Sequence, residues 1–118
     1  PRGEAVVAYS LGNFVSNQGY EYVRGGRGRG IEPPLWLPAT RDGVWLRIAL
    51  QIDGGRVQVQ AIEGVPLWTE NNYPRERDHH EDANIRVVPL SSVEDEALRA
   101  ERRRAIGGAL GSHVHLLD

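Results

Sequence analysis

The clearest hydrophobic pattern in the chain is an alternation that runs through residues 43–63. Apolar side chains occupy every second position from Val44 to Ile52, with mixed residue types between them. Period two places alternate side chains on opposite faces of a strand. The adjacent Gly54–Gly55 pair supplies the positive φ angles that a tight turn needs, and a second alternation begins at Val57. The pattern predicts a β-hairpin with one buried face and one mixed face.

The second strand of this hairpin is expected to alternate as regularly as the first. Regular spacing places Val57, Val59 and Ala61 on the apolar face and places Ile62, with the glutamines, on the opposite face. The segment Val65–Trp68 either extends this strand or crosses to another layer.

Two further segments predict strands, and one predicts a helix. Ala5–Tyr9 is a run of apolar residues rich in β-branched and aromatic types, typical of a strand that is covered on both faces inside a larger sheet. Ile85–Val88 is a shorter strand candidate. Ser91 or Ser92 can cap a helix predicted from about Val93 to Ala109. The interrupted apolar stripe of this helix indicates that it lies on a surface.

The remaining segments show no hydrophobic period. Residues 16–41 are rich in Gly and Pro and predict a long loop, and residues 70–84 are mostly polar. The inventory indicates an α+β fold with a hairpin, one or two further strands and a C-terminal helix. A free domain of this size buries about two thirds of its unfolded surface, and these segments add little to that. We therefore expect a single partial domain over 1–118, with a β region at 5–89 and a helix and tail at 90–118.

Composition excludes several classes of protein. The chain has 118 residues, with 14 basic and 16 acidic side chains and a net charge of −2, which excludes a general polyanion-binding or membrane-surface protein on charge alone. Cysteine is absent, which excludes disulfides, thiolate metal sites and cysteine nucleophiles. No apolar run approaches the roughly 18 residues of a membrane span. The chain begins at Pro1 and has no Met, which leads us to expect a piece of a longer protein.

The run from Tyr9 to Phe14, YSLGNF, resembles a signature of the CapA family. These are bacterial capsule-synthesis proteins associated with poly-γ-glutamate, with a fold similar to calcineurin-like metallophosphoesterases. The segment Thr40–Gly43 before a hairpin and the segment Val65–Trp68 also resemble the family, so the resemblance covers about residues 5–89. It implies that the chain is the C-terminal region of such a protein, at the end of a four-layer metallophosphoesterase-like sandwich.

The resemblance also implies a function. The whole protein would serve capsule or poly-γ-glutamate biosynthesis with metal-dependent, hydrolase-type phosphoesterase chemistry. In the family, the acidic, Asn and His motifs that resemble two-metal ligands lie N-terminal to the signature. Divalent metal ions are therefore expected in the full-length protein and none in this chain, which alone would be inactive. The expected partners are the missing N-terminal region or a second copy, and the expected substrate is an anionic polymer or a phosphate ester. Both the cell envelope and the cytoplasm stay open as locations.

Ser10 and Asn13 are the first candidate site residues. They lie where a predicted strand ends in a Gly-containing turn, a position that collects site-lining side chains in layered α/β proteins. In a phosphoesterase-like site, Asn13 would bond a metal-bound oxygen or a substrate phosphate, and Ser10 would do likewise. The alternative is that Asn13 holds the turn through its own backbone and Ser10 ends the strand.

Arginines in the long loop are candidates for contact with an anionic substrate. They are Arg24, Arg27, Arg29 and, where the loop meets the hairpin, Arg41. The first three lie in the tract RGGRGRG, a pattern that also occurs in nucleic-acid-binding segments. Three phosphate contacts give only weak binding, so nucleic-acid binding ranks third among the hypotheses. A plain disordered loop is the alternative.

Two histidine pairs have metal-ligand residue types. His79 and His80 are adjacent on a polar segment, where neighbouring side chains point apart, and we interpret them as a solvated loop. His113 and His115 would share one face of a strand, which is good metal geometry, but they lie in a tail that is expected to fray. Neither pair is predicted to bind a metal.

Trp45 carries the second hypothesis, a non-catalytic binding or assembly module. It occupies the mixed face of its predicted strand, away from the core side. Tryptophans in such positions seal a sheet against a neighbouring layer or form a contact surface. In this hypothesis the hairpin and its Trp45 face dock another chain.

Overall fold

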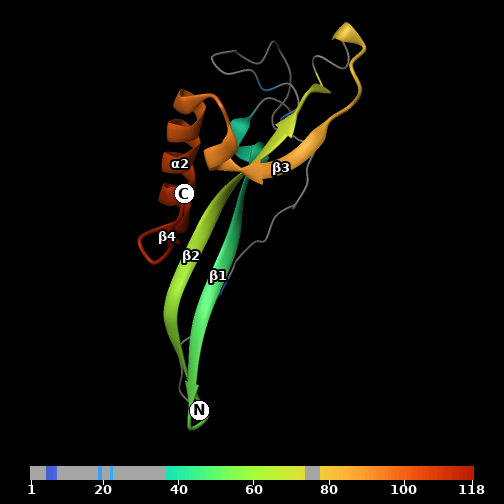
Figure 1. Cartoon of the computed structure of the whole chain (residues 1–118). Coiled ribbons are helices and arrows are strands. Elements are labelled where there is room, and N and C mark those ends of the chain that lie inside the picture. Colours follow the sequence, from blue (N-terminus) through green and yellow to red (C-terminus); the bar gives the residue numbers. More distant parts are fainter. Residues whose placement is uncertain (1–4, 8–18, 20–21, 23–36, 74–77) are drawn as a thin grey trace.

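A computed structural model describes residues 5–7, 19, 22, 37–73 and 78–118 (Figure 1). These residues contain a four-stranded, mainly antiparallel sheet and one α-helix, which confirms the α+β class. The molecule measures 61 × 26 × 24 Å, and a long hairpin accounts for its greatest dimension. No helix in the described ranges is long and apolar enough to cross a membrane.

Strands β1 (Asp42–Asp53) and β2 (Arg56–Asn71) form the predicted hairpin. The turn residues Gly54 and Gly55 have φ angles of 52° and 80°, which match the left-handed pair of a tight hairpin turn. Strand β2 continues without a break through residues 65–68. Of the two alternatives for that segment, the structure therefore shows an extension of the strand.

Strand β2 is the centre of the sheet. Strand β1 pairs along one of its edges, and β3 (Ile85–Pro89) pairs antiparallel with its last residues on the other edge. The two-residue strand β4 (His115–Leu116) pairs parallel with Glu63–Gly64. The prediction of a short strand at 85–88 is confirmed.

A β-bulge corrects the predicted alternation of the second strand. Ala49 pairs with Ala61, but the next residue, Leu50, pairs with Val59, so Gln60 is an extra residue on β2. An extra residue reverses which face the following side chains occupy. Ile62 consequently lies opposite Ile48 on the apolar face, and Ala61 does not. Regular spacing had placed both on the wrong faces.

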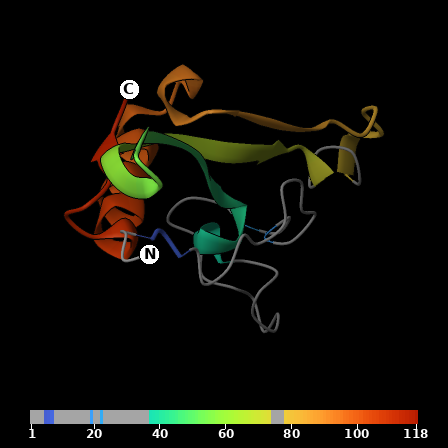
Figure 2. The ribbon, with the colours of Figure 1, turned by 90° about the horizontal axis from the view of Figure 1, so that it is seen from below.

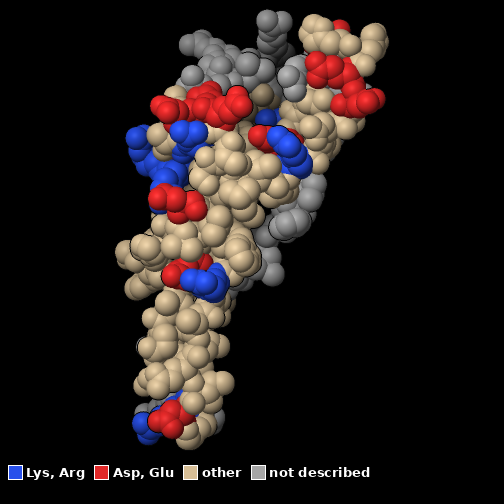
Figure 3. Space-filling view, in the orientation of Figure 1, with Lys and Arg blue, Asp and Glu red and all other residues tan. Residues whose placement is uncertain are grey.

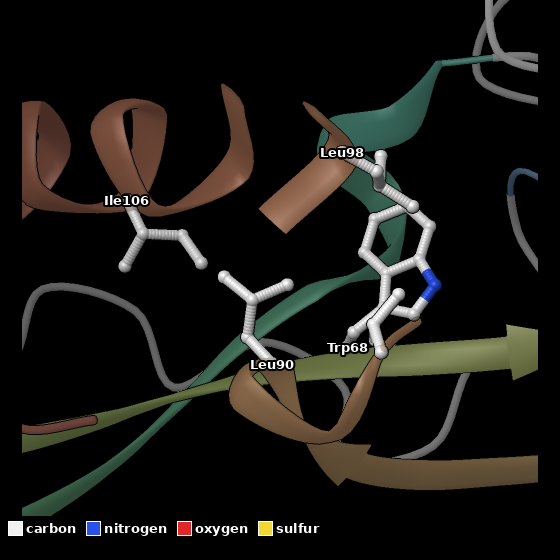
Figure 4. Close-up of a cluster of buried hydrophobic side chains, with 5 residues drawn as sticks. Trp68, Leu90, Leu98 and Ile106 are labelled. Atoms are coloured by element: carbon white, nitrogen blue, oxygen red, sulfur yellow. The ribbon is translucent and has the colours of Figure 1, made fainter. Parts of the chain in front are cut away.

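The core lies between the sheet and the helix α2 (Glu96–Leu110) (Figure 4). It consists of Trp68 from β2, Leu90 from the 3-10 helix η2 (Leu90–Ser92), Val93 from the following connection, and Leu98 and Ile106 from α2. Seen along the hairpin from its tip, α2 lies behind the tip at one side, and β3 extends to the other side (Figure 2).

The helix begins three residues later than predicted, at Glu96. Its N-cap is Asp95, whose carboxylate accepts a hydrogen bond of 3.0 Å from the backbone N–H of Leu98. The predicted serine caps do not act, because residues 90–92 form η2. In that turn the Ser92 hydroxyl donates to the Pro89 carbonyl instead. The connection between η2 and α2 is extended at Val93.

One face of the hairpin is covered over only part of its length. Near α2, Gly64 lies so close to Val44, Val114 and Leu116 that a Cβ there would stand 3.1–3.3 Å from their side chains. Further along the same face, Leu50 is 53% exposed. Figure 1 shows this part of the hairpin extending beyond α2. The predicted burial of the apolar face is correct near α2 and wrong beyond it.

The predicted N-terminal strand is also corrected for the residues that are described. Ala5–Val7 are exposed, form no strand and pair with none of the described strands. The rest of the predicted strand, residues 8 and 9, lies outside the described residues.

Candidate functional site

Among the six predicted site residues, only Arg41 lies within the described part of the chain. It is the last residue of the 3-10 helix η1 (Pro38–Arg41), directly before β1. The other five lie outside the described residues, and their roles stay predictions: Ser10, Asn13, Arg24, Arg27 and Arg29.

Arg41 is a buried cation, only 6% exposed. The carbon of its guanidinium lies 5.5 Å from the ring centroid of Trp68 and 6.0 Å from that of Tyr22, within the range of cation–π attraction. Its Nη2 donates a 3.1 Å hydrogen bond to the backbone carbonyl of Asn71. Its Nε is buried and has no hydrogen-bond partner among the described residues.

Burial lowers the pKa of Arg41 from its ordinary value, because a buried guanidinium loses hydration. An arginine keeps its charge even so. Arg41 therefore places a positive charge beside the rings of Tyr22 and Trp68, directly before β1. Whether this charge meets an anionic substrate stays a prediction.

Gly19 lies close against η1. This residue has φ of +68°, and a Cβ at its position would stand 2.5 Å from the Thr40 hydroxyl oxygen. Only glycine meets both conditions without strain. The Gly19 carbonyl also accepts a hydrogen bond of 3.0 Å from the N–H of Tyr22, which places the Tyr22 ring edge-on to Trp68. This turn positions the aromatic wall beside Arg41.

A second buried charge, Arg102 of α2, was not among the predicted site residues. Its side chain is 8% exposed and makes two hydrogen bonds to the Asp42 carboxylate, Nε–Oδ1 at 3.1 Å and Nη2–Oδ2 at 2.5 Å. This two-pronged ion pair joins the start of β1 to the middle of α2. The signal was present in the sequence, because Leu98, Arg102 and Ile106 are spaced four residues apart on one stripe of the helix.

The environment shifts the pKa of both partners. Burial raises the pKa of Asp42, and the hydrogen bond and charge of Arg102 oppose that rise. The hydrogen bond to Asp42 raises the pKa of Arg102 above its ordinary value, against the effect of burial. The pair is thus a desolvated structural contact. The raised pKa means that the Asp42 carboxyl group loses its proton at a higher pH than a free aspartate does.

The histidines do not assemble a metal site among the described residues. His79 and His80 are exposed, and the backbone at His80 takes a positive φ of 55°. Only His115 belongs to β4, whereas His113 lies in the turn before it, so the pair does not share a strand face. Over ranges 37–73 and 78–118, and the short described pieces before them, no three His, Asp or Glu side chains converge. The metal ions that the resemblance implies belong to motifs N-terminal to this chain, and their presence in the full-length protein stays a prediction.

Charged side chains are unevenly distributed over the surface (Figure 3). They gather over α2 and occur again at the tip of the hairpin. Arg47 and Glu63 form an ion pair across the two strands of the hairpin. Trp45 is 64% exposed and lies opposite Val65 on the mixed face, as predicted. Its contact with another chain stays a prediction.

Comparisons of the chain with protein-family models, with curated proteins and with solved structures found no match.

Proposed function

We propose that the chain is the C-terminal assembly region of a CapA-like protein of capsule or poly-γ-glutamate biosynthesis, and that its hairpin docks onto another sheet of the same polypeptide. The observation that carries the docking proposal is the arm, residues 48–62, which projects beyond α2. One face of this arm, called the arm face below, is a continuous apolar surface. This face consists of Ile48, Leu50, Ile52, Val57, Val59 and Ile62.

The arm face continues the face that α2 covers at the other end of the hairpin. The bulge at Gln60 keeps it continuous, because it returns Ile62 to the side occupied by Ile48. Ile52 is 72% exposed. A sheet with one apolar face is stable when another layer of secondary structure covers that face. The arm therefore has the surface of a sheet that lacks its second layer.

The size of the arm face favours a cover within the same polypeptide. Two strands spaced 4.8 Å apart and six residues long give a face of roughly 10 by 20 Å, or about 200 Å² in projection. Stable interfaces between separate proteins bury about 800 Å² per partner. A tethered sheet supplies a high effective concentration and needs less contact area.

The YSLGNF resemblance suggests which sheet this is. In a metallophosphoesterase-like sandwich it would be the sheet of the N-terminal region, which carries the metal-ligand motifs. Hydrolase-type chemistry then belongs to the whole protein. This chain contributes the docked hairpin, with Ser10 and Asn13 as proposed site-lining residues.

The first test is the intact mass and N-terminal sequence of the product of the natural gene. We expect a heavier protein with acidic, Asn and His motifs upstream of Pro1. A mature product that begins at Pro1 would overturn the CapA-like proposal.

The second test uses that longer protein and two matched substitutions in β1. Leu50→Lys places a charge on the arm face, and Gln51→Lys places the same charge on the opposite face. We expect L50K to increase protease cleavage of the arm at least tenfold and to abolish metal-dependent phosphoesterase activity, while Q51K resembles the wild type. Equal behaviour of the two variants would contradict docking through the arm face.

A second candidate function, the binding module, rests on the exposed Trp45 indole. If the mixed face docks a separate chain, this chain self-associates or captures a partner, and Trp45→Arg abolishes the association. Analytical ultracentrifugation of the two forms decides this, and a wild type that stays monomeric at high concentration excludes self-association.

A further inference from the structure

A hollow beside α2 is lined neither by residues of the arm face nor by Trp45 of the mixed face. It has a volume of about 450 Å³ and lies between α2, η2, β2 and the end of the chain. Sites for small molecules typically measure about 300–1,000 Å³. We propose that this hollow binds a small organic carboxylate of about the size of an amino acid. The proposal is independent of the function proposed above.

Two arginines on successive turns of α2 line the hollow, Arg99 and Arg103. Side chains four residues apart on a helix lie on the same side of it, about 5–6 Å apart at Cβ. Both arginine side chains therefore border one hollow. Planar guanidinium groups bind carboxylates through two parallel hydrogen bonds, which is the strongest common recognition of that anion.

Backbone carbonyls hold both guanidinium groups in place. Arg99 Nη1 donates to the carbonyl of Val93, before the helix. Arg103 Nη1 and Nη2 donate to the carbonyls of Leu117 and Leu116, at 2.7 and 3.2 Å. Each guanidinium has five N–H donors, so these bonds fix its position and use only part of its capacity. A site held in this way loses little conformational freedom when a ligand binds.

The carboxylates beside the hollow are exposed and easily displaced. Asp118 Oδ1 lies 3.2 Å from Arg103 Nη2, and Glu96 Oε1 lies 3.6 Å from Arg99 Nη2, yet these acidic side chains are 96% and 88% exposed. Exposed ion pairs contribute only about 0–1 kcal/mol. A ligand carboxylate that binds a fixed guanidinium replaces them at small cost.

The walls and the charge of the hollow define the ligand class. Leu90 and Pro66, both buried, and Ala100 supply an apolar surface suited to a short hydrocarbon segment. The two arginines are matched by two acidic side chains, so the lining is formally neutral. A polyphosphate has no hydrocarbon segment to place against these apolar walls. A monocarboxylate or dicarboxylate with a short apolar body matches this lining.

The test is calorimetric titration of the chain with glutarate at low salt, and with inorganic phosphate as the competing anion. We expect glutarate to bind at least tenfold more tightly than phosphate. Arg103→Gln should weaken glutarate binding at least tenfold, whereas Arg104→Gln, on the exposed neighbouring position, should stay within twofold of the wild type. Ala100→Phe, which fills the hollow from an exposed helix position, should also abolish binding and keep the helical circular dichroism signal.

Three results would overturn the proposal. They are no glutarate binding by the wild type, equal binding of phosphate and glutarate, and equal losses in R103Q and R104Q. The last result would show general charge attraction by α2 in place of a site.

Discussion

The two ends of the hairpin share one sheet and one apolar face, yet only one end is covered. In the body half, residues 42–47 and 63–71, Trp68 is 3% exposed and packs under α2 and η2. In the arm, Ile48, Leu50 and Ile52 on that face are 40–72% exposed, and Val57, Val59 and Ile62 are half-buried. Alternation therefore predicts which face of a strand is buried. The elements that pack on that face determine how far along the strand the burial extends.

Element lengths explain where the cover ends. The fifteen residues of α2 span about 22 Å at the rise of an α-helix. The sixteen residues of β2 span about 53 Å at the rise of a strand. One helix of this length cannot cover one strand of that length. The arm is most of the excess of strand.

The largest expected contrast is between truncations at the two ends. Trp68→Ala removes a buried ring from the core and is expected to cost about 3–5 kcal/mol of unfolding free energy. Leu50→Ala on the arm face is expected to cost less than about 1 kcal/mol, because the side chain is already half exposed. Urea unfolding of both variants at one protein concentration measures this. Equal losses would break the comparison, since they would mean that something covers the arm in solution.

A second contrast lies within α2, between a buried and an exposed arginine. Arg102→Ala leaves the Asp42 carboxylate buried without its partner and is expected to cost about 3 kcal/mol. Arg104→Ala removes the same charge from an exposed position and should stay within about 0.5 kcal/mol of the wild type. Adding Asp42→Ala to R102A measures the coupling energy in a double-mutant cycle. Purely additive losses would contradict a specific pair.

Sequence patterns predicted the hairpin, its glycine turn, the short third strand and the presence of the helix, because each depends on local spacing. The start of the helix was missed because Ser91, Ser92 and Asp95 are all good N-caps. The structure uses Asp95, and in that register Leu98 and Ile106 lie in the core. The burial of Arg102 was not predicted, because the charged run Glu101–Arg104 was interpreted as an interruption of the apolar stripe of the helix.

Candidate site residues were less predictable than the fold. Arg41 was chosen for its charge, and its burial between two aromatic rings depends on a turn at Gly19 that lies distant in sequence. The hollow at α2 is formed by parts of the chain that only packing brings together. The cover on the arm face cannot be predicted from periodicity, since the alternation of β1 is the same in both halves.

The smallest expected effect tests the bulge that keeps the two halves in phase. Deleting Gln60 removes the extra residue and leaves every other pair of the register in place, so Val57, Val59 and Ile62 stay on the arm face. The deletion removes the exposed side-chain hydrogen bond from Gln60 to Gln51. We expect a change in unfolding free energy within about 1 kcal/mol and unchanged cross-strand contacts by nuclear Overhauser effects.

Deleting Gln58 is the matched control, because it removes the same residue type two positions away. In either register that the shortened strand can adopt, Val57 or Val59 moves to the opposite face. The Gln58 deletion should therefore disturb the tip contacts and speed amide exchange along the arm, and the Gln60 deletion should not. If the Gln60 deletion shifts the pairing of Ile48 with Ile62 as well, Gln60 is not the extra residue of the strand and the bulge does not keep the two halves in phase.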